Sequence, residues 1–419
     1  MTVNSGELTV GWEIKPIGEV CKTGAGGTPL KSNKEYYEGG QIPWLLSGEV
    51  AQGEIFKSEN FITQTGLDNS SAKIFPVNTV LVAMYGATAG QVGILRFEAA
   101  TNQAVCGILP NETFIPEFIY YALLSKKAEL ISKAAGNAQP NISQIKIRTT
   151  EIPVPPLDEQ KRIVGILDEA FEGCDRAILN TEKNLANSRE LFESYLNAIF
   201  TQKEDTWVEK KLGDAELIQI IDGDRGTNYP QKSDFYPEGY CLFLNTKNVR
   251  PDGFNFDTTM FITEEKDNLL RKGKLKRRDV ILTTRGTIGN IAIYDDNVEF
   301  DHIRINSGML VFRPNEKIIK SEYLFEILRS ALMKSQIKKF TSGAAQPQLP
   351  IKTLVNFSLP VPKKLEDQSQ IISNLQELYT ETQRLETIYK QKLTALKELK
   401  QSILQKAFTG KLATDSLRC

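Results

Sequence analysis

The sequence predicts a mixed α/β (α+β) protein in which two similar domains are separated by two long antiparallel helices that form a coiled coil with pseudo-two-fold symmetry. Three observations predict this fold: an internal repeat of about 200 residues, short β-branched stretches within each copy, and a helical heptad pattern after each copy. We expect the first domain at residues 1–155, the central helix at 156–203, the second domain at 204–362 and the carboxyl-terminal helix at 363–419.

The repeat is visible as matching short motifs that occur in the same order in both halves of the chain. The matching segments are Gly11-Trp12 and Thr206-Trp207, Val80–Gly90 and Val280–Gly289, Gly136–Pro140 and Gly343–Pro347, and Ile152–Pro155 and Leu359–Pro362. This period is much longer than that of a solenoid repeat, so it indicates two copies of a whole domain.

Within each copy, the apolar stretches are short, β-branched and interrupted by Gly, Pro and Asn. Residues 73–95 and 279–294 are therefore predicted to form hairpins. The aromatic-rich stretches 116–130 and 321–333 have helical spacing and are predicted to be core helices of the two domains.

Each domain is followed by a heptad seam, in which apolar residues alternate at steps of four and three. The first seam comprises Leu167, Phe171, Cys174, Ile178, Thr181, Leu185, Ser188, Phe192, Tyr195 and Ile199. The second comprises Leu375, Leu378, Thr382, Leu385, Tyr389, Leu396, Leu399 and Ile403, with Lys392 as the one polar misfit. We expect the two seams to pair with each other; the alternative is that each docks on another subunit.

The expected start of each long helix follows a Pro-rich hinge and carries acids, Asp158 and Glu159 in one case and Glu366 and Asp367 in the other. Acids in a first turn suit the positive end of a helix dipole, and proline marks where a helix can begin. A helix of about 40 residues spans roughly 60 Å. An antiparallel pair of such helices would hold the two domains at its opposite ends.

Composition indicates a globular protein, with 41% hydrophobic and 25% charged residues among 419. No apolar run is long enough to cross a membrane and the first ten residues lack the features of a secretory signal, so we expect a cytoplasmic protein with no membrane partner. The five cysteines are far apart and lack a CxxC pair, which favours free thiols over a zinc site.

The formal net charge of -1 hides a basic segment, residues 271–285, which contains seven Lys or Arg against the single acid Asp279. A near-neutral protein is not expected to coat nucleic acid, so any DNA affinity has to come from local patches or from partner subunits. Taken alone, such a run is more often a solvated surface.

Two similar but diverged domains on a rigid spacer suit a ligand with two different half-sites at a fixed distance, and duplex DNA is such a ligand. Enzymatic alternatives are weakened by what the sequence lacks. His302 is the one histidine, and Gly24–Pro29 lacks the lysine of a phosphate-binding loop and is interpreted as a turn. No Asn-Pro-Pro-aromatic or Asp-Pro-Pro-Tyr sequence of an amino-methyltransferase occurs. We expect neither catalytic residues nor a metal site in this chain.

Several motifs resemble the signatures of the specificity subunits of type I restriction-modification systems. They are Thr23–Pro29, Gly40–Trp44 and Pro155–Gln160 in the first copy, Asp222–Thr227 and Leu365–Gln368 in the second, and Lys400–Leu412 at the carboxyl end. The resemblance covers nearly the whole chain. Ala25 is inserted in the glycine motif, Gln41 replaces a usual acid and Lys363-Lys364 interrupts the second proline motif, so individual DNA contacts cannot be transferred.

The resemblance implies that each target-recognition domain reads one half of a bipartite, asymmetric site in double-stranded DNA, a role in phage defence. It also implies that the helices bind two modification subunits, which would carry S-adenosylmethionine and methylate adenine. Restriction subunits that use ATP and Mg²⁺ would join them to cleave unmethylated DNA. No cofactor is expected in this chain.

Candidate DNA contacts are polar side chains near Gly-flanked turns, because base edges are recognised by Arg, Asn and Gln and phosphates by Lys and Arg. The candidates are Lys22, Lys31, Lys34, Lys57, Tyr85, Asn102 and Gln103 in the first domain, and Arg225, Lys247, Arg250, Lys274, Arg277, Arg285 and Arg304 in the second. Lys274 to Arg285 is the candidate phosphate-binding stretch.

Two other function classes remain open from the residues alone. One is a fused nuclease or methyltransferase, or the specificity part of such a system, with its own active site. The other is a coiled-coil scaffold that joins two proteins without DNA. Assaying the purified chain with DNA, Mg²⁺ and S-adenosylmethionine tests the first alternative. Salt-sensitive binding to duplex DNA in the presence of a partner tests the second.

Overall fold

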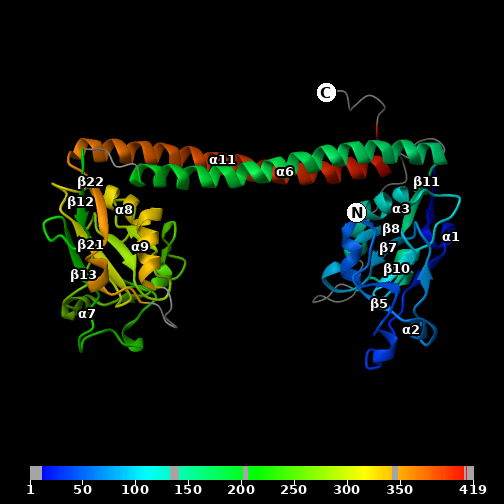
Figure 1. Ribbon diagram of the computed structural model, residues 1–419, viewed down its shortest axis with the longest axis horizontal. Coiled ribbons are helices and arrows are strands. Elements are labelled where there is room, and N and C mark those ends of the chain that lie inside the picture. Colours follow the sequence, from blue (N-terminus) through cyan, green and yellow to red (C-terminus); the bar gives the residue numbers. More distant parts are fainter. Residues whose placement is uncertain (1–11, 133–140, 202–205, 342–347, 410–411, 413–419) are drawn as a thin grey trace. The chain divides into compact units, whose positions relative to one another are not determined.

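The computed structural model describes residues 12–132, 141–201, 206–341, 348–409 and 412 (Figure 1). The chain divides into two compact units, residues 1–182 with 391–419 (unit 1) and residues 183–390 (unit 2). Each long helix therefore contributes one half to each unit. The helices begin at Leu157 and Leu365, within two residues of the predicted starts at 156 and 363.

Unit 1 begins with short strands and ends in a long helix. Its elements are β1 (Glu13–Pro16), α1 (Ile17–Val20), β2 (Thr23–Ala25), η1 (Lys34–Tyr36), β3 (Ile42–Leu45), η2 (Ser47–Gln52), β4 (Glu54–Ile55), β5 (Phe61–Ile62), α2 (Gln64–Asp68), β6 (Ile74–Phe75), β7 (Val80–Ala83), η3 (Gly86–Thr88), β8 (Val92–Leu95), β9 (Ala99–Thr101), β10 (Val105–Ile108), α3 (Pro116–Ser125), α4 (Lys127–Ser132), α5 (Gln144–Arg148), β11 (Glu151–Val154) and α6 (Leu157–Thr201), whose second half belongs to unit 2.

Unit 2 repeats this order. Its elements are β12 (Trp207–Lys211), β13 (Ile218–Asp222), η4 (Lys232–Asp234), β14 (Cys241–Leu244), η5 (Thr246–Asn248), β15 (Val249–Arg250), β16 (Gly253–Phe254), β17 (Phe261–Ile262), α7 (Glu264–Leu269), β18 (Val280–Thr283), β19 (Ile291–Ile293), β20 (Ile303–Ile305), β21 (Met309–Pro314), α8 (Ser321–Arg329), α9 (Ala331–Thr341), α10 (Ile351–Leu354), β22 (Ser358–Pro362) and α11 (Leu365–Phe408), whose second half belongs to unit 1.

Both units contain an equivalent pair of sheets, which differ in their number of strands. The larger sheet has the strand order β2-β10-β7-β8-β4 in unit 1 and β13-β21-β18-β19 in unit 2. A smaller sheet follows the order β5-β3-β9-β6 in unit 1 and β17-β14-β20 in unit 2, with β3·β9 and β14·β20 parallel. The predicted hairpins are confirmed as β7·β8 and β18·β19, which pair antiparallel.

Two of the matching motifs become equivalent structural elements. The Pro-containing strands β11 and β22 pair antiparallel with β1 and β12, which begin near Trp12 and at Trp207. The predicted core helices are confirmed as α3 with α4 and α8 with α9. Gly136–Pro140 and Gly343–Pro347 lie outside the described residues, as do Gly11, Cys419 and Gly410-Lys411 of the carboxyl-terminal motif.

Figure 1 shows α3 in unit 1 and α8 in unit 2 between the larger sheet and the helix pair, while α2 and α7 lie at the ends of their units far from that pair. In unit 1 the main core joins α3 and β7 to Leu167 of α6 and Leu404 of α11. In unit 2 it joins α8 and β18 to Phe192 of α6 and Leu375 of α11. The long helices thus complete the core of each domain and are not separate from it.

The predicted pairing of the two seams is confirmed within each unit. In unit 1, Lys400 of α11 bonds Asp175 of α6 at 2.6 Å and lies over the Phe171 ring. In unit 2, Arg189 of α6 bonds Glu386 of α11 at 3.2 Å. Because the beginning of one helix meets the end of the other, the two helices run antiparallel in both units.

The register of the seam differs from the prediction near the end of each helix. Tyr195 and Leu399, predicted in the seam, are 38% and 47% exposed, whereas Leu196 and Leu404 are buried. Both helices take successive steps of four at equivalent places, so the seam does not keep a strict heptad. The misfit Lys392 is exposed for the same reason, and its neighbour Leu393 is partly buried.

The motifs Pro155–Gln160 and Leu365–Gln368 each form a hydrogen-bonded clamp at the start of a long helix. The fully buried Gln160 amide donates to the Thr113 and Pro155 carbonyls, each at 2.9 Å, and its oxygen accepts the Ile115 N–H. In unit 2, the Gln368 amide donates to the Ile318 and Pro362 carbonyls. Its oxygen accepts the Lys320 N–H at 2.9 Å. Each glutamine therefore ties its long helix to the loop before α3 or α8.

Cys21, Cys106, Cys174 and Cys241 are buried free thiols, as predicted for these four. Burial raises the pKa of both Cys106 and Cys241 to about 12. Among the described helices, none combines the length and hydropathy that a membrane crossing requires.

Candidate nucleic-acid interface

Three loops of unit 1 meet at one end of its sheets, and we call them loop cluster 1: Gly26–Thr28, Met84–Gly86 and Asn102–Ala104. The Gly27 N–H donates to the Thr101 carbonyl at 2.9 Å, and the Met84 N–H donates to the Ala104 carbonyl at 2.8 Å. The Thr28 hydroxyl donates to the Gln103 side chain. Of the sequence candidates, Tyr85, Asn102 and Gln103 are thus brought together.

Residues of the motifs Thr23–Pro29 and Gly40–Trp44 pack in the interior beneath loop cluster 1. A Cβ on Gly26 would lie 2.3 Å from the Asn102 carbonyl oxygen, and one on Gly27 would lie 2.2 Å from the backbone nitrogen of Ala72. The Trp44 indole N–H donates to the Gly27 carbonyl at 2.9 Å. These residues are therefore needed for close backbone packing. Gly24 and Ala25 belong to β2 and residues 26–29 form an irregular segment, so the predicted turn is wrong, while no α-helix follows directly, as expected.

Unit 2 contains the equivalent loops, which we call loop cluster 2: Gly223–Gly226, Thr284–Gly286 and Asn306–Gly308. A Cβ on Gly223 would lie 2.3 Å from the Asn306 carbonyl oxygen, just as Gly26 meets Asn102. The Thr284 N–H donates to the Gly308 carbonyl at 2.8 Å, and an Arg225 Nη2 donates to the Ser307 carbonyl at 3.4 Å. Arg225 and Arg285 therefore lie in one cluster.

Lys247 is exposed on η5, beside loop cluster 2. Its neighbour Thr246 would lie 3.6 Å from a Cβ on Gly286 and 3.1 Å from one on Gly308. Loop cluster 2 thus displays Arg225 and Arg285, with Lys247 beside it, whereas loop cluster 1 displays the uncharged side chains of Thr28, Tyr85 and Gln103.

The side chains of Asn102 and Asn306 have a structural role in these loops. The Asn102 Oδ1 accepts the Ala104 N–H at 3.1 Å, and the Asn306 Oδ1 accepts the Gly308 N–H at 2.9 Å. Each asparagine thereby stabilises the tight turn that follows it. The amide nitrogens of both residues remain candidates for a base contact.

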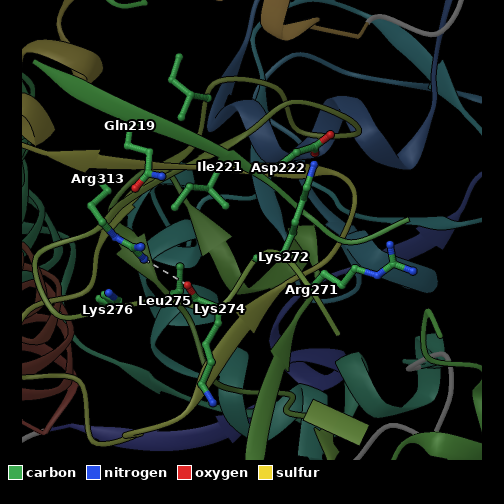
Figure 2. Close-up of a pocket in the computed structure, with 11 residues that line it drawn as sticks. Gln219, Ile221, Asp222, Arg271, Lys272, Lys274, Leu275, Lys276 and Arg313 are labelled. Carbon is green, nitrogen blue, oxygen red and sulfur yellow. Dashed lines mark hydrogen bonds between the residues drawn. The ribbon is translucent and has the colours of Figure 1, made fainter. Parts of the chain in front are cut away.

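A groove of about 530 Å³ lies beside strand β13 in unit 2, and Figure 2 shows its lining. Gln219, Ile221 and Asp222 of β13 form one side, and the basic segment from Arg271 to Lys276 forms the other. The Asp224 carboxylate holds this segment in place, because its Oδ2 accepts the N–H groups of Arg271 at 2.7 Å and Lys272 at 3.3 Å. We call the groove between β13 and this segment the basic groove.

The charges of the basic segment divide into those engaged within the protein and those facing solvent. Lys274 pairs with Asp267, and Arg278 pairs with Asp296 and Glu322. Arg277 donates to the Asp295 and Val298 carbonyls at 2.6 and 2.8 Å and stacks on Tyr294. Within the described segment 271–285, the exposed side chains for which no hydrogen bond or ion pair is found are Arg271, Lys272 and Lys276.

Arg304 has to be withdrawn as a candidate contact, because its side chain is 4% exposed and fully engaged. Its Nε donates to Asp267 Oδ1 at 2.7 Å, and its two terminal nitrogens donate to the Lys272 and Asp267 carbonyls at 2.6 and 2.9 Å. Burial alone would raise the pKa of the Asp267 carboxyl, but the hydrogen bonds from Lys274 and Arg304 outweigh it and lower that pKa.

The remaining candidates are exposed but lie outside the loop clusters. Lys22 precedes β2 and its carbonyl accepts the Leu109 N–H, at the end of that strand opposite Gly26. Lys31 and Lys34 lie on the segment around η1, where Lys34 is 3.8 Å from Glu38, and Lys57 follows β4. Arg250 is on the β15·β16 hairpin. Arg271, Lys272 and Lys276 were not chosen as individual candidate contacts, although the basic run 271–285 contains them.

The described residues contain no group of three or more His, Cys, Asp or Glu side chains that could hold a metal ion. His302 stacks on the Tyr240 ring with the ring centroids 4.2 Å apart, which agrees with the structural role expected for a single histidine.

Comparison with known proteins places both repeats in one family. The model of the type I restriction modification DNA specificity domain matches residues 9–186 and again residues 204–395. The MjaIX specificity subunit of a type I restriction enzyme from Methanocaldococcus jannaschii is 25% identical, covering 98% of this chain and 96% of its own. The EcoR124I/EcoR124II specificity subunit from Escherichia coli is 30% identical over 44% of this chain and 48% of its own.

Solved structures share the fold. The HsdS subunit from Thermoanaerobacter tengcongensis matches with a TM-score of 0.65 at 21% identity, covering 98% of this chain and 100% of that one. A chain from a structural study of complex assembly and conformational transition of the type I R-M system matches with a TM-score of 0.77 at 21% identity, covering 97% of this chain and 100% of that one. With its two matching domains, the chain belongs to the type I restriction-modification DNA specificity family.

Proposed function

We propose that this DNA specificity subunit reads a bipartite, asymmetric site, with loop cluster 1 facing one half and loop cluster 2 facing the other. The observation that carries the proposal is the repetition of the same three-loop frame with different exposed side chains. Thr28, Tyr85 and Gln103 in one cluster correspond to Arg225, Arg285 and Ser307 in the other. Two equivalent frames with unlike surfaces suit two unlike half-sites, because sequence is read by side chains that reach base edges.

The chain acts in this proposal as a non-catalytic subunit. Two modification subunits bind to the helices, supply S-adenosylmethionine and methylate adenine, and restriction subunits that use ATP and Mg²⁺ join the complex. Support comes from the family membership and from the helix pair, whose outer faces carry exposed apolar residues such as Leu179 and Ile388. Exposed apolar side chains on both helices suit protein partners.

Base-modification sequencing of the source genome, with and without this gene, tests the proposal. The expected result is one split, asymmetric motif whose adenine methylation disappears on deletion. If no motif changes, reconstitution with the modification subunit decides the matter. A reconstituted complex that methylates DNA without this sequence preference, or equally well without the chain, would contradict the proposal.

The basic groove is proposed to bind DNA phosphates through Arg271, Lys272 and Lys276. Charge reversal of Lys272 and Lys276 together is expected to weaken binding of the assembled complex to all sequences. It should also reduce the slope of log K against log salt by about 2, since each lost phosphate contact contributes about 0.9. Charge reversal of Lys274 or Arg277 is a poor test, because both side chains hold the fold together.

The matched controls for this experiment are Lys317 and Lys363, which are exposed in the same unit outside the basic groove. Lys317→Glu together with Lys363→Glu changes the net charge by the same amount. An unchanged salt slope in the Lys272/Lys276 variant, or an equal change in the control, would rule out the groove as the phosphate site.

A further inference from the structure

The side chains of Tyr85 and Arg285 project from the same backbone position of the two repeats. Each follows the central strand of the larger sheet by two residues and precedes a glycine with φ of +71°, Gly86 in one case and Gly286 in the other. Each also forms an isolated antiparallel bridge, Tyr85 with Asn141 and Arg285 with Gln348. The local frames are therefore equivalent while the side chains differ.

The backbone beneath these two positions is fixed from both sides. In unit 1, the Met84 N–H donates to the Ala104 carbonyl and the Ile142 N–H donates to the Met84 carbonyl, both at 2.8 Å. In unit 2, the Thr284 and Arg285 N–H groups donate to the Gly308 carbonyl at 2.8 and 3.3 Å. The Leu349 N–H donates to the Thr284 carbonyl at 3.1 Å. A side chain on so constrained a base is held in a defined position, as base readout requires.

The chemical environments of the two positions differ in charge. Tyr85 is 39% exposed beside the neutral pair Thr28 and Gln103. Arg285 is partly buried beside Arg225, and no hydrogen bond or ion pair of its guanidinium occurs among the described residues. Arg285 thus offers a complete set of donors at a fixed place, whereas Tyr85 offers an aromatic ring and one hydroxyl.

We propose that positions 85 and 285 are the equivalent specificity-determining positions of the two modules, an inference that rests on the proposed function. Arg285 selects a G·C pair in the half-site of unit 2, because its guanidinium can donate two hydrogen bonds to the O6 and N7 of guanine. Tyr85 selects an A·T pair in the half-site of unit 1, where its ring contacts the thymine methyl group.

The test uses the full chain assembled with its modification subunit and reads methylation on a DNA library that varies every base pair of the split motif. Arg285→Gln is expected to lower the preference for one G·C pair by about 10-fold or more, in one half-site alone. Tyr85→Ala is expected to relax one A·T pair in the other half-site. The double exchange of Tyr85→Arg with Arg285→Tyr should alter both positions.

Arg285→Lys separates a base contact from a phosphate contact. A lysine keeps the charge but not the two parallel donors, so a base contact predicts loss of the G·C preference with an unchanged salt slope. Lys317→Gln, on an exposed lysine of the same unit outside the loop cluster and the basic groove, is the control and should leave the motif intact. Thermal unfolding of each variant verifies that the fold is retained.

Failures of the two proposals give different results. If the wild-type complex methylates no split motif, the proposed function is wrong. If the wild type methylates one and Arg285→Gln or Arg285→Lys leaves its G·C preference intact, or relaxes both halves equally, the assignment of position 285 is wrong. A half-site of unit 2 without a G·C pair would overturn it as well.

Discussion

The interiors of the two smaller sheets show how differently the same frame can be filled. In unit 1, Ala100 of β9 pairs with Trp44 of β3, and Leu67 of α2 packs against the same apolar cluster. In unit 2, the equivalent positions are Arg304, which pairs with Phe243, and Asp267 of α7, and the two form a buried ion pair. An apolar contact in one repeat thus corresponds to an ionic contact in the other.

A second exchange occurs next to it. Gly27 of unit 1 packs against the backbone nitrogen of Ala72, while in unit 2 the Asp224 carboxylate accepts the backbone N–H groups of Arg271 and Lys272. The segment after Ala72 carries the single cation Lys73, where unit 2 carries the basic groove. Divergence therefore extends from the surface loops into the interior that supports them.

The parts of both units that face the helix pair have instead stayed alike. Gln160 and Gln368 make the same three kinds of hydrogen bond at the starts of α6 and α11. The comparison teaches that the frame and the helix junction are shared, while the end of each unit that carries the loop cluster is specific to it.

The largest expected effect concerns the buried ion pair. Arg304→Met removes the donor to Asp267 Oδ1 and the donor to the Lys272 carbonyl, so that the buried Asp267 carboxylate keeps Lys274 but loses its buried ion pair. The change should destabilise unit 2 by about 3 kcal/mol or more. The double change Asp267→Leu with Arg304→Ala copies Leu67 and Ala100 and should recover most of that loss. Hydrogen exchange of the β14 and β20 amides measures the effect, with β3 and β9 as the internal control. A double variant as unstable as Arg304→Met would show that the pair Asp267 and Arg304 is not equivalent to Leu67 and Ala100.

The register of the helix seam can be tested at equivalent positions of the two units. Leu196→Ala in unit 2 and Leu404→Ala in unit 1 remove buried side chains and should each cost about 2–5 kcal/mol. The exposed neighbours provide controls, because Tyr195→Ala and Leu399→Ala should cost less than about 1 kcal/mol. Thermal unfolding compares the four variants. Equal losses for exposed and buried positions would favour the strict heptad that the sequence suggested.

The glutamine clamps should prove equally important in both units. Gln160→Leu and Gln368→Leu each leave buried backbone groups without partners, and each should cost about 1–3 kcal/mol. Loss of protection at the amides of Ile115 and Lys320 locates the effect. Gln376→Leu, on an exposed glutamine of α11, is the control. A large difference in stability loss between Gln160→Leu and Gln368→Leu would show that the two helix junctions differ in energy despite their similar geometry.

Acid pH should separate the two units by a smaller effect that vanishes near neutrality. Because the folded-state pKa of Asp267 lies below its ordinary value, its charge stabilises unit 2 above that value, and this contribution is lost as the pH falls below about 4 and through the lowered pKa. The wild type should therefore lose stability more steeply between pH 5 and pH 3 than the Asp267→Leu/Arg304→Ala variant does. If the thermal stabilities of the wild type and the variant fall in parallel with pH, Asp267 is not the cause of the acid sensitivity.

The sequence by itself determined the repeat, the hairpins, the core helices and the start of each long helix. These features depend on local chemistry: Gly, Pro and β-branched residues restrict the backbone, and apolar periodicity selects strand or helix. The motif around Gly26 and Trp44 was also visible, although the reason for it, close backbone packing, was not. Tyr85, Gln103, Arg225 and Arg285 were chosen as side chains near glycine turns, and the fold brings them into two clusters.

Only the tertiary structure decided which charges are available. The sequence suggests surface cations at Lys274, Arg277 and Arg304, but these side chains bond to Asp267 or to carbonyls of distant loops. The side chains that face solvent are instead those of Arg271, Lys272 and Lys276. The seam likewise shifted from Tyr195 to Leu196, because the helix has to present its apolar side to the core of unit 2. Both outcomes depend on partners far away in the chain, and local composition contains no record of which residues will meet.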